Sequence, residues 1–252
     1  MPCDEVSHAD GAAFPLSPLG PMLELRVLVP VIALALSAPL EILDLASARL
    51  GPGAPSGWKV RAVRGQQAPE IEIRNDGQGA LLRIHGAGRA AWFYRELASE
   101  LAESAGALQW SWRVLAAPAE ADLRVEQRDD APIRVFVVFG TQGFFRRSAR
   151  IIFYTFGNAE PLAFERASFG SDKLHVIRVD GARERASWQE HAVDPFADYR
   201  RIWNQAPPAI TAVGVMQDTD QTREQATAEL RRLAWVPALD LPAAGTSAPA
   251  AP

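Results

Sequence analysis

Hydrophobic and polar residues alternate along much of this chain, and this period of two constrains the fold more than any other feature. Residues 108–114 read Leu-Gln-Trp-Ser-Trp-Arg-Val, with apolar side chains at the even positions and polar side chains at the odd ones. Successive side chains of a strand point to opposite faces, so the pattern predicts a strand with one buried face. The same alternation at 71–74 ends in Asn-Asp-Gly at 75–77, which predicts a turn into a returning strand at 81–84.

Other segments predict strands of different burial. Residues 133–139 are apolar on both faces apart from Arg134, which is typical of a central strand that is covered on both sides. Residues 150–156 have a similar pattern. Shorter strands are predicted at 58–63, 92–97, 174–179, 210–217 and 230–236.

Two segments carry helical signals. Residues 95–104 are rich in helix-forming residues and predict a short helix or a loop. Asp194 is a candidate N-cap for a helix at 194–203, with Pro195 at its first position and apolar residues three and four apart on one face. Roughly ten short strands with few helices predict a mainly all-β fold, an antiparallel β-sandwich of jelly-roll type with one or two short helices.

The two ends of the chain differ from this body. The apolar run at 27–36 is too short to span a bilayer but has the length of a signal-peptide core. We therefore expect 1–38 to be a leader, with an export signal at 22–38 that begins at Met22. Residues 238–252 are rich in Ala and Pro and predict a flexible tail, which leaves 39–237 as one sandwich domain.

These ends imply a location. The signal predicts a periplasmic or secreted protein with no transmembrane segment in its mature chain. The alternative is a cytoplasmic protein in which the apolar run is a first strand or helix.

Charge and cysteine content exclude several classes of function. The chain has a net charge of −4 and therefore lacks the excess of basic residues that binds a polyanion. No nucleic-acid partner is expected. The chain has a single cysteine, Cys3, which excludes intrachain disulfides and metal sites with several thiolate ligands. The sequence has no Gly-x-Ser-x-Gly elbow, phosphate-binding loop or His-Glu-x-x-His motif, and its four histidines have no ligand spacing, so we predict no catalytic residues.

Two acidic segments are the chemically most informative features. Asp129 and Asp130 precede the strand that carries Arg134, and Asp218, Asp220 and Thr222 follow the strand at 210–217. An unpaired buried charge is costly, so we predict that Arg134 pairs with Asp129 or Asp130.

Three interpretations of these carboxylates are open. An oxygen-rich turn can hold Ca²⁺, so a calcium ion is a possible cofactor, although none is required. Paired carboxylates can also act on a glycosidic bond. The simplest interpretation is that Asp and Thr side chains cap their own turns.

The tryptophans offer a second kind of evidence. Trp110 and Trp112 lie on the apolar face of their predicted strand and are expected in the core. Trp58, Trp188 and Trp203 lie near the ends of predicted elements, where an exposed indole can stack on a sugar ring. Core or rim packing is the simpler expectation for each of these three residues.

The order of these segments resembles a bacterial family of unknown function, DUF 3047, over residues 40–236. The most specific pieces are the Asp-Asp pair before the strand of Arg134 and the turn Met-Gln-Asp-Thr-Asp-Gln-Thr at 216–222. The resemblance implies an exported β-sandwich and no established activity. Ala131 and Pro132 stand where the family usually has an aromatic residue.

These observations lead to three hypotheses. The first is an exported, non-catalytic module that binds a carbohydrate or another envelope component. Its candidate ligand-binding residues are Asp129, Asp130, Arg134, Tyr154, Asp218, Asp220 and Thr222, with Tyr154 or Trp112 as the aromatic neighbour. The second is a glycan-active hydrolase or lyase that uses the paired carboxylates, and the third is a purely structural envelope protein.

Overall fold

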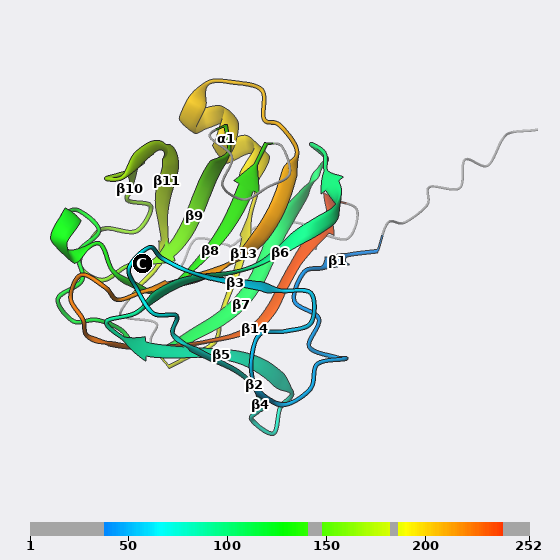
Figure 1. Cartoon of the computed structure of the whole chain (residues 1–252). Coiled ribbons are helices and arrows are strands. Elements are labelled where there is room, and N and C mark those ends of the chain that lie inside the picture. Colours follow the sequence, from blue (N-terminus) through cyan, green and yellow to red (C-terminus); the bar gives the residue numbers. More distant parts are fainter. Residues whose placement is uncertain (1–37, 141–147, 182–185, 239–252) are drawn as a thin grey trace, which may run out of the picture. The chain divides into compact units, whose positions relative to one another are not determined.

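The computed structural model describes residues 38–140, 148–181 and 186–238, with the backbone alone at 98–100 (Figure 1). Of the predicted leader, the structure describes only Ala38. Of the predicted tail, it describes only residue 238. No helix among the described residues is long and apolar enough to cross a membrane.

Two seven-stranded sheets build the described body. Sheet A has the order β12 (Gln189–Val193), β7 (Gly106–Ala116), β14 (Gln225–Pro237), β5 (Ala80–Ala87), β4 (Glu70–Asn75) and β2 (Gly51–Pro52), and β1 (Leu40–Glu41) pairs with β14. Sheet B has the order β10 (Glu165–Ser168), β11 (Ser171–Asp180), β9 (Arg150–Phe156), β8 (Ala131–Phe139), β13 (Ile210–Asp218), β6 (Ala90–Leu101) and β3 (Lys59–Ala62).

The two sheets pack face to face as a jelly-roll sandwich, which confirms the predicted fold class. Alternate residues from both sheets fill the space between them, including Trp110, Trp112, Val135 and Phe139. Among the described residues, every pair of neighbouring strands is antiparallel except β9 with β11, which run parallel.

Sheet B is covered on its outer face as well. A second apolar cluster there contains Phe136, Val138, Phe153 and Met216, with Leu123 packed over it from the segment before β8. All nine residues of β8 are buried, so the predicted central strand is confirmed. Side chains on β8 therefore alternate between the core and this covered outer face.

The predicted helix at 194–203 is confirmed as α1 (Pro195–Trp203), at one end of the sandwich (Figure 1). The Asp194 side chain accepts hydrogen bonds from the backbone N–H groups of Phe196 and Ala197, each at 3.0 Å. A one-turn 3₁₀ helix, η1 (Glu126–Arg128), lies directly before Asp129.

The prediction of a short helix or loop at 95–104 was wrong, because β6 continues through this segment to Leu101. Leu101 pairs with Ile210 at the far end of β13. Pairing with a central strand outweighs the small helix propensity of a few Ala, Glu and Leu residues.

Candidate functional site

Arg134 lies on the outer face of sheet B, beside the strand ends where the two acidic segments meet. Its Nη2 atom is 3.0 Å from Oδ1 of Asp129 and also donates to the Asp129 backbone carbonyl at 2.8 Å. The predicted ion pair is therefore confirmed. Burial alone would lower the pKa of Arg134, but the charges of Asp129, Asp218 and Asp130 raise it above its ordinary value.

Asp129 is shared between two guanidinium groups. Its second oxygen, Oδ2, lies 2.6 Å from Nη2 of Arg166, a residue of β10. The Arg166 side chain also donates to the carbonyl of Leu123 and stacks over Phe169, with Cζ 3.8 Å from the ring centroid. These contacts join the segment before β8 to the edge of sheet B.

The Asp130 side chain forms hydrogen bonds with the turn that follows β13. The residue is 1% exposed. Its carboxylate accepts hydrogen bonds from the N–H groups of Gln221 and Thr222 at 3.2 and 2.7 Å, and from the Thr222 hydroxyl at 2.6 Å. Burial raises the pKa of Asp130, and these hydrogen bonds oppose the rise. Asp130 and Thr222 therefore act as caps that hold the turn in place.

A second set of bonds fixes the same turn from the other side. Thr219 is fully buried and exchanges hydrogen bonds of 2.9–3.0 Å with the backbone of Arg89, in the turn between β5 and β6. The Gln217 amide donates to the carbonyls of Ile84 and Pro132, one on each sheet. The motif at 216–222 thus holds the ends of both sheets together.

Asp218 and Asp220 remain partly exposed on this fixed turn. Asp130, Asp218 and Asp220 each place an oxygen within 4.8 Å of the others. The Oδ1 atom of Asp218 is buried and accepts no hydrogen bond from a described residue. Burial raises the pKa of Asp218 to about 8; Arg134 opposes the rise, and Asp220 and the other carboxylates add to it. We call Asp129, Asp130, Asp218, Asp220, Arg134 and Arg166 the acidic cluster.

The structure places Tyr154 and Trp112 away from the acidic cluster. Tyr154 pairs with Val135 and faces the core, and its hydroxyl donates to Asp198 of α1 at 2.8 Å. The Trp112 indole donates to Asp180 at 2.7 Å, also inside the sandwich. Because faces alternate along a strand, neither ring can reach the face that carries Arg134.

Trp92 is a partly exposed aromatic residue on the face that carries Arg134, next to the buried rings of Phe136 and Phe153, and its sequence pattern predicted only a strand. In the register of sheet B, Trp92 lies opposite Met216, and Met216 lies opposite Arg134. Asp218 is two residues beyond Met216, so Trp92 and Asp218 are diagonal neighbours on adjacent strands. Trp92 is half-buried and packs edge-on against Phe136, with centroids 5.0 Å apart. Only the strand register relates these residues, and no local sequence pattern encodes it.

The other predicted indoles are engaged in packing. Trp58 is buried and donates to the carbonyl of Ile42, and Trp203 donates to the carbonyl of Asp172. The ring of Trp188 packs against two guanidinium groups, those of Arg113 and Arg231.

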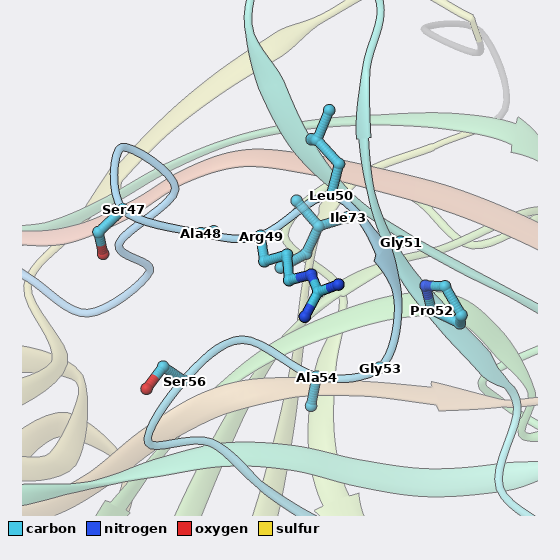
Figure 2. A pocket seen from close by; sticks show the side chains of 10 residues that line it. All are labelled: Ser47, Ala48, Arg49, Leu50, Gly51, Pro52, Gly53, Ala54, Ser56 and Ile73. Carbon is cyan, nitrogen blue, oxygen red and sulfur yellow. The ribbon is translucent and has the colours of Figure 1, made fainter.

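Three pockets among the described residues lie away from the acidic cluster. Figure 2 shows one of about 560 Å³, which is lined by residues 47–54, Ser56 and Ile73, with the Arg49 side chain reaching into it. Two others, of about 480 and 240 Å³, lie next to α1 and on sheet A. None of these three contains a residue of the acidic cluster.

One known protein family matches this chain. The family described as "Protein of unknown function (DUF3047)" matches residues 56–234. The chain belongs to the DUF3047 family. The match includes both acidic segments of this DUF3047 protein. Comparison with curated protein sequences gives no match.

Several solved structures are similar to this DUF3047 protein in fold, at low sequence identity. One is a family 11 carbohydrate-binding module of a cellulosomal cellulase of Clostridium thermocellum, with 10% identity, 80% of this chain and 96% of that chain covered, and a TM-score of 0.45. Another is a β-1,2-glucanase from Parabacteroides distasonis, with 9% identity, 82% and 26% covered, and a TM-score of 0.44. A third is the xyloglucanase domain of NopAA from Sinorhizobium fredii, with 10% identity, 75% and 98% covered, and a TM-score of 0.40.

Proposed function

We propose that this DUF3047 protein is an exported, non-catalytic module that binds a carbohydrate or another hydroxyl-rich envelope component at the acidic cluster. The observation that carries the proposal is the convergence of Asp218 and Asp220 on one rigid turn, with half-buried Trp92 on the adjacent strand. Carboxylates accept hydrogen bonds from sugar hydroxyls, and an indole packs against the apolar face of a sugar ring.

The residues of the cluster divide into two kinds in this proposal. Asp129, Asp130 and Arg134 are occupied by one another and by the turn, so they supply rigidity. Asp218 and Asp220 have exposed surface, and Asp220 accepts only from its neighbour Gln221 within the described residues. The side chains of Asp218, protonated below about pH 8, and of Asp220 are the groups proposed to meet the ligand, since a rigid polar group loses little entropy on binding.

The test is retention on insoluble peptidoglycan together with a glycan array. We expect the wild-type protein to be retained. Asp220→Asn should weaken retention at an unchanged melting temperature, and Trp92→Phe should weaken retention well below its own melting temperature, which the lost packing against Phe136 lowers. Asp172→Asn, which removes an exposed carboxylate elsewhere, is the matched control. No retention of the wild type on any glycan or envelope fraction would refute the proposal, as would full retention of both cluster variants.

The hydrolase or lyase hypothesis receives less support from the geometry. Acid–base catalysis on a glycosidic bond needs two carboxyl groups that flank the bond. Asp129 accepts from two arginines, and Asp130 accepts three hydrogen bonds from its own turn. Neither carboxylate is available to a substrate without breaking these contacts.

A calcium ion at this turn stays a prediction. When all four carboxyl groups of the cluster are ionised, they face two guanidinium groups, so one divalent cation would balance the formal charge once Asp218 has released its proton. Melting in CaCl₂ and in EDTA tests it. A rise in melting temperature with Ca²⁺ that Asp220→Asn abolishes would support the ion, and identical curves would exclude it.

Export is the second part of the proposal. It rests on the apolar run at 27–36, which falls outside the described residues. Fractionation of a bacterium that expresses the full chain, followed by N-terminal sequencing, should find the protein outside the cytoplasm and cleaved near residue 38. An intact chain in the cytoplasm would contradict it.

A further inference from the structure

The outer face of sheet A carries a positively charged pocket that the proposed function does not use. The pocket has a volume of about 240 Å³, and Arg74, Arg83 and Arg113 line it together with Asp76 and Glu229. It lies on the opposite side of the sandwich from the acidic cluster, because the cluster is on the outer face of sheet B.

The strand register builds this pocket. Glu229 of β14 lies directly opposite Arg83 on β5 and opposite Arg113 on β7, so the three side chains form one row. Glu229 is 4% exposed and accepts from Nε of Arg113 at 2.5 Å. Arg113 also reaches Asp76 at 3.3 Å, and Asp76 accepts from Arg231 at 2.8 Å.

Trp188 orders two of these guanidinium groups. Cζ of Arg113 lies 4.7 Å and Cζ of Arg231 lies 4.2 Å from the centroid of the indole ring. Cation–π contacts with one ring hold both planes in place before any ligand arrives. A site that is ordered in advance loses less entropy on binding.

Arg83 lies opposite two carboxylates in the strand register, Glu229 on β14 and Glu72 on β4, but it forms no hydrogen bond with either. Its Nη1 atom is 3.7 Å from Glu229, which is too long for a hydrogen bond, and its side chain donates no hydrogen bond to any described residue. The Nε atom of Arg83 is buried and has no hydrogen-bond partner in the part of the chain that the structure describes. A buried donor without a partner is costly, and an anionic acceptor would satisfy it.

The local charge points to the same kind of ligand. The patch has one positive charge more than it has negative ones, although the whole chain carries −4. The patch contains four guanidinium groups and three carboxylates. They belong to Arg74, Arg83, Arg113 and Arg231, and to Glu72, Asp76 and Glu229.

We propose that this pocket binds an oxyanion, with the guanidinium of Arg83 as the principal donor. A guanidinium group offers a planar fork of N–H donors that matches a carboxylate, a sulfate or a phosphate. The ligand is therefore the anionic group of an acidic sugar or a free inorganic oxyanion. The site is independent of the acidic cluster and does not rest on the proposed function.

The test is titration of the full chain with sodium phosphate, sodium sulfate and glucuronate at constant ionic strength, followed by calorimetry and thermal melting. We expect saturable binding of at least one anion, and the anion bound most tightly distinguishes a uronic acid from an inorganic source. Arg83→Gln should raise the Kd at least about tenfold, because one charge-assisted bidentate contact is lost. Arg83→Lys should restore only part of the affinity.

Arg49→Gln is the matched control, because Arg49 is exposed, forms no ion pair with another described residue and lines the separate pocket of Figure 2. This variant should bind like the wild type. No saturable response to any of the three anions would overturn the proposal. So would unchanged affinity in Arg83→Gln at a normal melting temperature, or loss of binding in Arg49→Gln, which would move the anion to the other pocket.

Discussion

At the residue scale, the behaviour of Asp218 is determined by its neighbours. The carboxyl group has a buried oxygen that accepts no hydrogen bond from the residues that the structure describes, and three other acidic side chains lie close to it. Its pKa of about 8, against an ordinary value of 3.8, means that the folded protein holds a proton that the unfolded chain releases. Between about pH 4 and pH 8 the unfolded state binds fewer protons, so this residue lowers stability as the pH rises.

Asp218→Asn should remove this pH dependence. Asn imitates the protonated acid in shape and carries no charge, so the variant should match the wild type near pH 4. It should be more stable by roughly 2 kcal/mol or more at pH 8. Urea unfolding in EDTA across this range measures the difference, and Asp172→Asn controls for the change in net charge. Parallel curves for wild type and Asp218→Asn would disprove the assignment.

Arg134, in contrast to Asp218, should stabilise the folded state through its charge. Arg134→Met would remove the cation that opposes the negative charge of Asp130 and Asp218 on a covered face, although Asp129 keeps Arg166. We expect a loss of about 3–5 kcal/mol in the free energy of unfolding. Arg49→Met, at an exposed position, should change it by less than about 0.5 kcal/mol. A comparable loss in both variants would contradict a special role for the ion pair.

At the element scale, sequence patterns predicted what depends on local periodicity and missed what depends on partners. The strand at 150–156 matches β9, and the cap at Asp194 matches α1, because alternation and capping are local properties. The extension of β6 to Leu101 and the parallel pairing of β9 with β11 are long-range properties. For the same reason the Arg134–Asp129 pair was predictable over five residues, whereas Arg166 and Trp92 were not.

Gly214 lies where strands β13 and β6 approach each other closely. A β-carbon at this position of β13 would lie 2.2 Å from the backbone oxygen of Phe93 on β6. Gly214→Ala should therefore destabilise the protein by roughly 2 kcal/mol or more, since backbone cannot move aside as a flexible side chain can. Gly170→Ala adds the same methyl group where nothing lies within 4 Å and should be nearly neutral. Thermal melting of both variants measures the contrast, and equal melting temperatures would contradict the close approach.

At the scale of the whole molecule, the sandwich separates two opposite kinds of surface. One outer face ends in carboxylates and the other carries excess guanidinium groups, while the apolar cluster between the sheets keeps them apart. Charge of either sign is therefore stabilised locally by partners on its own face. This arrangement requires that both sheets remain complete from β1 to the end of β14.

The predicted domain, 39–237, can be tested by shortening the chain. Ile42 and Leu43 follow β1 and are 1% and 3% exposed, and both donate their backbone N–H groups to the carbonyl of Leu233 on β14. A chain of residues 39–238 should therefore unfold cooperatively at the melting temperature of the full chain. A chain of residues 51–238 loses two buried side chains worth about 1.5–3 kcal/mol each, and should melt well below it. If 39–238 fails to fold, or if 51–238 is as stable as the full chain, the domain limits predicted from the sequence are wrong.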